Sequence, residues 1–471
     1  MNVENGKVKQ HHAGILVMAI STALVTTYSA SALNLAIPSM GAEFNSSASA
    51  LGWIVSTYLF CSVCLSLPFG KIADVISRRA ILLLGCVFYL VFSILAIFCT
   101  SMSAMLVMRV GQGMGAAMLF STNIAILIDA FPSNQRGSVM GLYTAATYTG
   151  ISIGPVLGGM LTDAFGWRSV FISMVLICFV ALLASALFVP SKRKEAQYDQ
   201  NSANHSGFRL DWAGMLCYIV SLVMLLYGLS TIGSSAWALP LMLIGMVGCV
   251  LFFLLEARVE DPLINVRVFA HNKNFLLSNL AAMFNYAATF AVCYLMSIYL
   301  QEVKGMNAWN AGLLMASQPV LQAIISPVSG RMSDRYSPFM LASAGMVVCT
   351  VALICFTFFS IDTPQVIIVG ALLLTGVGCG LFSSPNQTAI MSSVEAKDYG
   401  IASSLIATSR NIGQVFCMAL ITLVTSLSLG GATLADASKA QIAGSFRMEF
   451  IIFSVICAIG VFISLQRKGK A

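Results

Sequence analysis

The sequence predicts an all-α polytopic membrane protein, and the evidence is its composition and the length of its apolar runs. Hydrophobic residues make up 58% of the 471 residues and charged residues only 9%. Soluble domains carry about 25% charged residues, so this surface is matched to lipid rather than water. The apolar runs are about twenty residues long without alternation, the length of a membrane-spanning helix. Barrel strands are about half as long and alternate, so helices are favoured.

Fourteen runs are predicted to cross the membrane, with both chain ends in the cytoplasm. Most of the 25 Lys and Arg residues then fall in cytoplasmic loops, where basic residues accumulate. This bias accounts for the net charge of +7, so no nucleic-acid partner is needed to explain it. The expected location of the protein is the plasma (inner) membrane. The predicted runs are 14–38, 50–69, 80–100, 104–128, 138–162, 168–190, 211–231, 236–257, 275–300, 309–329, 339–359, 364–389, 400–428 and 447–466.

Two polar stretches, 191–210 and 258–274, divide the chain into three parts. Both read as cytoplasmic linkers, and they bracket two of the predicted spans. We predict an N-terminal six-helix bundle over 1–190, linkers with two inserted helices over 191–274, and a C-terminal six-helix bundle over 275–471.

A short motif recurs after the second span of each bundle. Repeated halves around a central site are typical of transporters. Each copy has a glycine, three further residues, an aspartate and a nearby arginine: Gly70, Asp74 and Arg78 in the first copy, and Gly330, Asp334 and Arg335 in the second.

The first copy resembles a loop signature of the major facilitator superfamily, and two other spans support the resemblance. The span 104–128 contains Arg109, Gln112 and Gly113 in the family's order. The span 138–162 resembles the antiporter motif at Gly150, Gly154, Pro155, Gly158 and Gly159. The fourteen spans, Asp211-Trp212-Ala-Gly214 and Pro262-Leu263 resemble the drug:proton antiporter branch. The resemblance implies the major facilitator fold, with two six-helix bundles, two inserted helices and secondary active transport.

By this resemblance the repeated loops form a conformational latch. The glycines are expected at tight cytoplasmic turns. The resemblance places Asp74 against the start of a helix near Gly400, and pseudo-symmetry places Asp334 against the start near Gly137.

Arg78 is expected to pair with Asp129 at the cytoplasmic end of the span 104–128. Such contacts favour the outward-open state of a two-state equilibrium. The alternative is that these loop charges are solvated and only set the topology.

The antiporter motif predicts close helix packing. Gly150, Gly154 and Gly158 recur every fourth residue, and Pro155 removes one helical hydrogen bond. The contact either seals the transport pathway or is ordinary helix packing, and both readings stay open.

Polar side chains inside the spans are candidates for the transport pathway. A charge at the depth of Arg109 costs several kcal/mol unless it is paired or hydrated, so a functional role is expected. The alternative is a structural charge bonded to carbonyls or to Gln112. The other candidates either line a cavity or join helices: Asn34, Asn386, Gln387, Arg410, Asn411 and Gln414.

One residue departs from the resemblance. The related antiporters carry an aspartate five residues before the asparagine that corresponds to Asn34, and Ser29 stands there in this chain. None of the 18 acidic residues is predicted at the middle of a span, and Glu449 is expected near the outer start of the last one. Without a buried anion, nothing offsets the free-energy cost of removing a cationic substrate from water, so neutral or anionic substrates are expected at least equally. Asp163 or Glu43 remains as an outer proton site.

The predicted function is efflux of small amphipathic compounds, of the multidrug type, by alternating access of the two bundles. The alternative is an importer or uncoupled facilitator of a neutral or anionic metabolite. The four histidines lie in polar segments, so neither an enzyme nor a metal site is expected. We expect a monomer in the lipid bilayer, with a small-molecule substrate, protons as the candidate coupling ion, no cofactor and no nucleic-acid partner.

Overall fold

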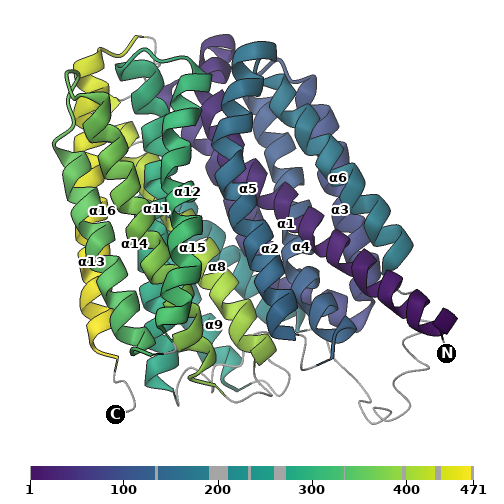
Figure 1. Ribbon diagram of the computed structural model, residues 1–471. Coiled ribbons are helices and arrows are strands. Elements are labelled where there is room, and N and C mark those ends of the chain that lie inside the picture. Colours follow the sequence, from purple (N-terminus) through teal and green to yellow (C-terminus); the bar gives the residue numbers. More distant parts are fainter. Residues whose placement is uncertain are drawn as a thin grey trace.

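The computed structural model describes residues 2–132, 136–189, 211–231, 235–258, 272–333, 335–394, 399–429 and 436–467. These residues form fourteen long α-helices (Figure 1). Counting the described residues alone, 13 helices are long and apolar enough to cross a membrane. The prediction of an all-helical polytopic protein is confirmed.

The helices fall into a first six, an inserted pair and a last six. The first six are α1 (Asn2–Phe44), α2 (Ala48–Val75), α3 (Arg78–Ile97), α4 (Met102–Ala130), α5 (Arg136–Phe165) and α6 (Arg168–Phe188). The inserted pair is α8 (Trp212–Thr231) and α9 (Ala238–Glu256). The last six are α11 (Lys273–Ile298), which continues into the π-helical turn η1 (Tyr299–Val303), α12 (Ala308–Met332), α13 (Pro338–Thr357), α14 (Gln365–Met391), α15 (Tyr399–Leu429) and α16 (Lys439–Leu465).

Capping side chains fix where several helices begin. Ser47 caps α2 and Asn307 caps α12, each accepting a backbone N–H three residues later. At α16, Ser438 and Gln441 form a capping box in which each side chain bonds the other residue's backbone. The sequence prediction started this helix near residue 447, so it was wrong at this end. The polar first turns of α16 lack the apolar character on which that prediction depended.

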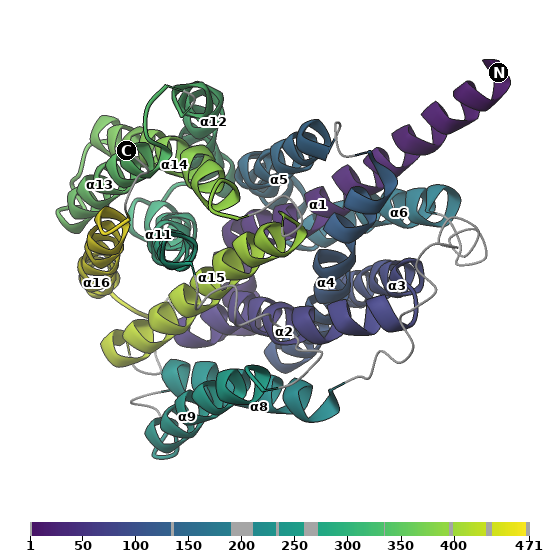
Figure 2. The same cartoon turned by 90° about the horizontal axis from the view of Figure 1, so that it is seen from below.

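The two sets of six helices repeat one packing pattern. In the first group α1 packs against α4, α5 and α6, and α3 packs against α4 and α6. In the second group α11 packs against α14, α15 and α16, and α13 packs against α14 and α16. Figure 2 shows the groups side by side, with α1–α6 on one side and α11–α16 on the other. The internal repeat therefore extends beyond the short motifs to the whole helix packing.

The inserted pair lies at one edge of the contact between the groups (Figure 2). Helix α8 packs against α9, against α2 of the first group and against α15 of the second. The hydroxyl of Tyr218 on α8 donates to the carbonyl of Val63 on α2 at 3.2 Å. Helix α9 exposes apolar side chains such as Leu243 and Val247, which suit a lipid-facing surface.

The two groups meet chiefly through α5 with α12, α2 with α15, and α1 with α11, and smaller contacts join α4 to α15 and α1 to α12. Helix α1 begins and α16 ends at the same end of the molecule (Figure 1), which we call the terminal side. The other end is the opposite side. Because the chain alternates, α5 and α15 run from the terminal side to the opposite side, and α2, α12 and α16 run back.

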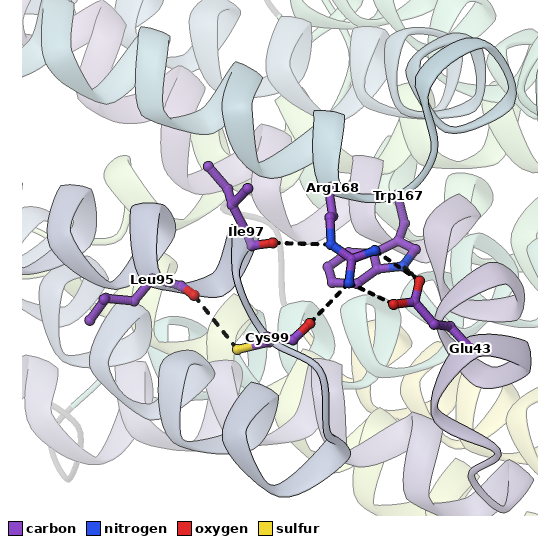
Figure 3. Close-up of polar contacts among 6 residues, drawn as sticks. All are labelled: Glu43, Leu95, Ile97, Cys99, Trp167 and Arg168. Carbon is purple, nitrogen blue, oxygen red and sulfur yellow. Dashed lines mark hydrogen bonds and ion pairs between the residues drawn. The ribbon is translucent and has the colours of Figure 1, made fainter.

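A hydrogen-bonded clamp closes the opposite side of the first group (Figure 3). The guanidinium of Arg168, the first residue of α6, donates to both carboxylate oxygens of Glu43 at 2.6 and 2.9 Å. It also donates to the carbonyls of Ile97 and Cys99, both at 3.1 Å. The indole of Trp167 donates to Glu43 at 2.7 Å. The clamp therefore joins the ends of α1 and α3 to the start of α6.

Candidate functional site

A cavity lies between the two groups, and its empty space, counted together with the open solvent at its mouth, is about 1150 Å³. Four helices of each group line it: α1, α2, α4 and α5 on one wall, and α11, α12, α14 and α15 on the other. The wall from the first group carries hydroxyl groups beside apolar side chains: Thr26, Thr27, Ser31, Tyr58 and Ser62.

The wall from the second group is rich in amides. Asn285 lies on α11, Gln318 and Gln322 lie on α12, and Asn411 and Gln414 lie on α15. The guanidinium-bearing Arg410 is next to them on α15, the aromatic residues Tyr286 and Phe290 lie on α11, and Phe120 of α4 faces the cavity from the first group. None of the described lining residues is acidic. The cavity thus offers hydrogen-bond donors and acceptors, ring faces and one positive charge.

Two of these amides differ in their hydrogen bonding. The side-chain nitrogen of Asn285 is buried without a hydrogen-bond partner among the described residues. Gln322 donates to the hydroxyl of Ser383 at 3.4 Å. A buried unpaired donor costs free energy, and this nitrogen is enclosed by protein atoms rather than open to the cavity.

Arg109 lies behind the wall of the cavity and is fully buried. Its Nε donates to the carbonyl of Ile54 at 2.8 Å, and its Nη1 donates to Gln112 at 2.7 Å and to Ser29 at 3.3 Å. Its guanidinium carbon lies 4.3 Å from the centre of the ring of Tyr58, which lines the cavity. The arginine therefore supports the first wall from behind.

The buried charge of Arg109 has no carboxylate partner among the described residues. Its Nη2 has no hydrogen-bond partner there at all. Gln112, which accepts from Arg109, donates in turn to the hydroxyl of Ser93 at 2.8 Å. Ser29 contributes only a neutral hydroxyl to this network. The antiporters that the sequence resembles carry an aspartate at this position.

The predicted pathway residues separate into three places. Arg410, Asn411 and Gln414 line the cavity together on α15. Arg109 and Gln112 lie behind it, as described above. Asn34 lies between the groups and is fully buried. Its amide donates to the sulfur of Cys293 at 3.2 Å, and its backbone carbonyl accepts from the hydroxyl of Ser297 at 2.7 Å.

Asn386 and Gln387 are not among the lining residues. Asn386 lies near the terminal end of α14, where its carbonyl oxygen accepts from Arg467 at 2.7 Å and its amide donates to the carbonyl of Ser278 at 3.3 Å. Arg467 follows the end of α16 and is only 6% exposed. Asn386 therefore connects the ends of α14, α11 and α16. Gln387 is partly buried on the same turn of α14.

Helices α5 and α12 form a tight seam on the opposite side. A Cβ atom at Gly159 would overlap the backbone carbonyl oxygen of Ala308, and one at Gly312 would overlap the carbonyl oxygen of Pro155. Glycine on each helix thus admits the backbone of the other. We call this contact, formed by Pro155, Gly159, Ala308 and Gly312, the opposite-side seam.

The remaining glycines of the antiporter motif face α1 within the first group. Gly150 lies against Thr27, Gly154 against Ser31, and Gly158 against Ala32. Just beyond the seam, the amide of Asn307 donates to the carboxylate of Asp163 at 2.9 Å. The motif therefore packs α5 against two helices, α1 in its own group and α12 in the other.

The first latch motif lies at the terminal side. Arg78 donates to Asp74 at 2.8 Å and also bonds Asp129 at the end of α4. Asp334 and the residues 395–398 that precede α15 lie outside the described residues. The two expected contacts of Asp74 and Asp334 with helix starts therefore stay predictions. Arg335 is exposed, next to Asp334.

The expectation of tight turns at Gly70 and Gly330 was wrong. Both residues lie inside helices, near the terminal ends of α2 and α12. A Cβ at Gly70 would lie 3.6 Å from Ser121 on α4, and one at Gly330 would lie 2.8 Å from Ser384 on α14. A side chain at Gly70 would thus make only an ordinary contact, whereas one at Gly330 would require Ser384 to shift.

Glu449 is a buried acid that the sequence prediction placed near a span boundary. Because α16 begins at Lys439, Glu449 lies ten residues inside the helix and is 2% exposed. The capping box at Ser438 and Gln441 is the sequence signal that would have located the helix start. The expectation that Glu449 lies near the outer start of the last span is corrected.

The chain was compared with known families. The model of the Major Facilitator Superfamily matches residues 19–418, and a second match covers residues 279–470. The chain belongs to the major facilitator superfamily. The fourteen helices fit the fourteen-helix branch of this superfamily, in which an extra pair separates two groups of six.

Several curated relatives cover most of the chain. It is 27% identical to a riboflavin transporter of Clostridioides difficile over 455 residues, which is 96% of both chains. It is 27% identical to a multidrug resistance protein of Mycobacterium tuberculosis, covering 83% of this chain and 71% of the relative. It is 24% identical to a multidrug transporter of Bacillus subtilis, covering 81% and 70%.

A solved structure shows the same fold. The crystal structure of a bacterial homologue of the human lysosomal transporter Spinster, in an inward-facing and unoccupied conformation, matches with a TM-score of 0.64. The two sequences are 14% identical, and the match covers 97% of each chain. As a member of a superfamily of transporters, this chain has its candidate solute site in the cavity between the two groups.

Proposed function

We propose that this major facilitator protein is a secondary transporter of small neutral or anionic amphipathic compounds, working by alternating access. The observation that carries the proposal is the lining of the central cavity. Its amides, hydroxyls and rings suit a flat molecule with polar edges, and Arg410 adds a positive charge. A lipophilic cation would find no carboxylate among the described lining residues to offset its desolvation.

The closed seam supports an assignment of the conformation. The terminal side is the cytoplasmic one in this proposal, because the basic loops gather there. With the opposite-side seam closed, the cavity is shut off from the outside. The structure then corresponds to the inward-facing state, and transport requires the seam to part. The two groups, over residues 1–190 and 275–471, are the units that move.

We place export first as the direction of transport. Two of the relatives are named for multidrug resistance or multidrug transport, which supports efflux of amphipathic compounds. A second candidate is uptake of a neutral metabolite. It is favoured by the relative named as a riboflavin transporter, which matches along 96% of both chains.

The test is transport in proteoliposomes with matched compounds. Riboflavin represents flat compounds without positive charge, and tetraphenylphosphonium represents lipophilic cations. We expect protein-dependent movement of riboflavin and none of the cation, with accumulation against a gradient showing the direction. Movement of the cation alone would contradict the proposal.

A matched pair of variants ties transport to the cavity. Gln414→Ala removes an amide that lines the cavity, and Gln387→Ala removes an amide that does not. Loss of one substrate hydrogen bond costs about 1.5 kcal/mol, so Gln414→Ala should slow transport by about tenfold. Gln387→Ala should leave it unchanged. Equal effects of the two variants would remove the cavity from the transport path.

A further inference from the structure

The buried carboxyl of Glu449 is not part of the cavity and needs an explanation of its own. It lies ten residues from the start of α16, about 15 Å along the helix from the opposite side. It is 2% exposed. Lipid-exposed or buried acids inside a span are costly and are retained chiefly where they act on ions or protons.

The surroundings of Glu449 provide hydroxyl donors rather than a cation. Its Oε1 accepts from the hydroxyl of Thr425 on α15 at 2.8 Å and from Ser445 on α16 at 3.4 Å. No lysine, arginine or histidine forms an ion pair with it among the described residues. The titratable groups that interact with it are Tyr294 on α11 and Cys417 on α15.

The other elements packed against this part of α16 contribute rings. Phe356 of α13 lies against Phe450, with ring centres 4.9 Å apart, and Tyr299 of η1 stacks on Phe446 at 4.7 Å. An ionised carboxylate in such surroundings is shielded from bulk water and has no counter-charge among the described residues, and a bound proton removes this cost.

We propose that Glu449 is the site at which the transporter binds its coupling proton. The proposal rests on the proposed transport function and adds the energy source. Uptake of one proton converts the carboxylate to a carboxylic acid, and its release restores the carboxylate. Only the O–H bond forms and breaks.

The contact between α2 and the second group explains how the site changes access. A Cβ at Gly52 of α2 would lie 2.9 Å from the hydroxyl of Thr422 on α15 and 3.6 Å from the hydroxyl of Tyr294. The backbone of α2 thus covers the hydroxyl of Tyr294, a group that interacts electrostatically with Glu449. Parting of the groups on the opposite side moves α2 away and opens this route to outside protons. Return to the present state covers it again.

The same side chains connect the proton to the solute cavity. Thr425, the nearest donor to Glu449, is on α15, and this helix also presents Arg410, Asn411 and Gln414 to the cavity. Protonation changes the hydrogen bond between α16 and α15. It therefore biases the helix that both lines the cavity and contacts α2.

Infrared difference spectroscopy of the full-length protein in liposomes tests proton binding without any substrate. We expect a carbonyl-stretch band of a protonated carboxylic acid that is lost in Glu449→Gln and retained in Glu302→Gln, a partly exposed acid of η1. Thr425→Val keeps the carboxyl and removes its nearest donor, so it should shift the band, and it serves if Glu449→Gln does not fold. A band unaffected by both Glu449→Gln and Thr425→Val would overturn the proposal.

A transport assay distinguishes proton coupling at Glu449 from solute transport itself. A pH gradient should stimulate transport of riboflavin, the compound tested in liposomes above, by wild type but not by Glu449→Gln, while exchange without a gradient persists in both. Wild-type stimulation in Glu449→Gln would overturn the proposal. If wild type moves no riboflavin, that result counts against the proposed function, and the infrared band still decides the proton site.

Discussion

Placing leucine at Gly159 is expected to stop transport while leaving the protein folded and inserted. A side chain there meets the backbone carbonyl of Ala308 across the opposite-side seam. Overpacking costs about 1–3 kcal/mol. Most of this cost falls on the state in which the seam is closed, because the nearest atoms belong to Ala308 of α12 and only the flexible side chain of Leu35 on α1 is met within the first group. The ratio of closed to open states should therefore drop by about 5- to 150-fold.

The measurement is transport together with labelling of a reporter cysteine at Thr289, a cavity residue, in a protein without its 13 native cysteines. In Gly159→Leu the reporter should react with a membrane-impermeant reagent from the outside. Gly370→Leu is the control, because a Cβ at Gly370 meets nothing within 4 Å. Wild-type labelling and transport in Gly159→Leu would show that the seam is not a gate.

Replacing Arg109 by lysine is expected to lower both the melting temperature and the transport rate. The ammonium of lysine does not reproduce the forked contacts with Ile54, Gln112 and Ser29. Each buried partner left unpaired costs about 1–3 kcal/mol. Because Tyr58 stacks on this guanidinium and lines the cavity, we expect transport to fall at least about tenfold.

The companion change Ser29→Asp should raise the melting temperature. It places a carboxylate beside a buried guanidinium whose Nη2 has no hydrogen-bond partner among the described residues. A charge-assisted hydrogen bond is roughly twice as strong as a neutral one. Ser29→Asn has nearly the same shape without the charge, so it is the control. Equal melting temperatures of these two variants would contradict the view that Arg109 has no counter-charge among the described residues.

The helices and their repeat were predictable because each is indicated by its own short stretch of sequence. Each long apolar run predicts a membrane span, and each basic loop indicates a cytoplasmic position. The resemblance of motifs such as that at Arg109 to a known family then implied the fold. The starts of helices were less accurate. At α16 the polar turns before Arg447 do not look like a membrane span, although the capping box at Ser438 marks the true start.

The long-range contacts of the site were not predictable from local pattern. Asn386 and Asn411 are both amides inside spans, yet one holds Arg467 and the other lines the cavity. Gly70 was expected at a tight turn, but it lies inside α2. Such differences depend on which neighbouring helix lies opposite each residue, and only the packed structure contains that information.

The central claim is that the cavity between the two groups binds neutral or anionic solutes. A thermal-shift measurement on the purified protein, with a panel of flat compounds matched in size and differing in charge, tests it most directly. Neutral and anionic compounds should raise the melting temperature, and Gln414→Ala should weaken that shift while Gln387→Ala does not. Stabilisation by cations alone, or shifts that ignore both variants, would contradict the account.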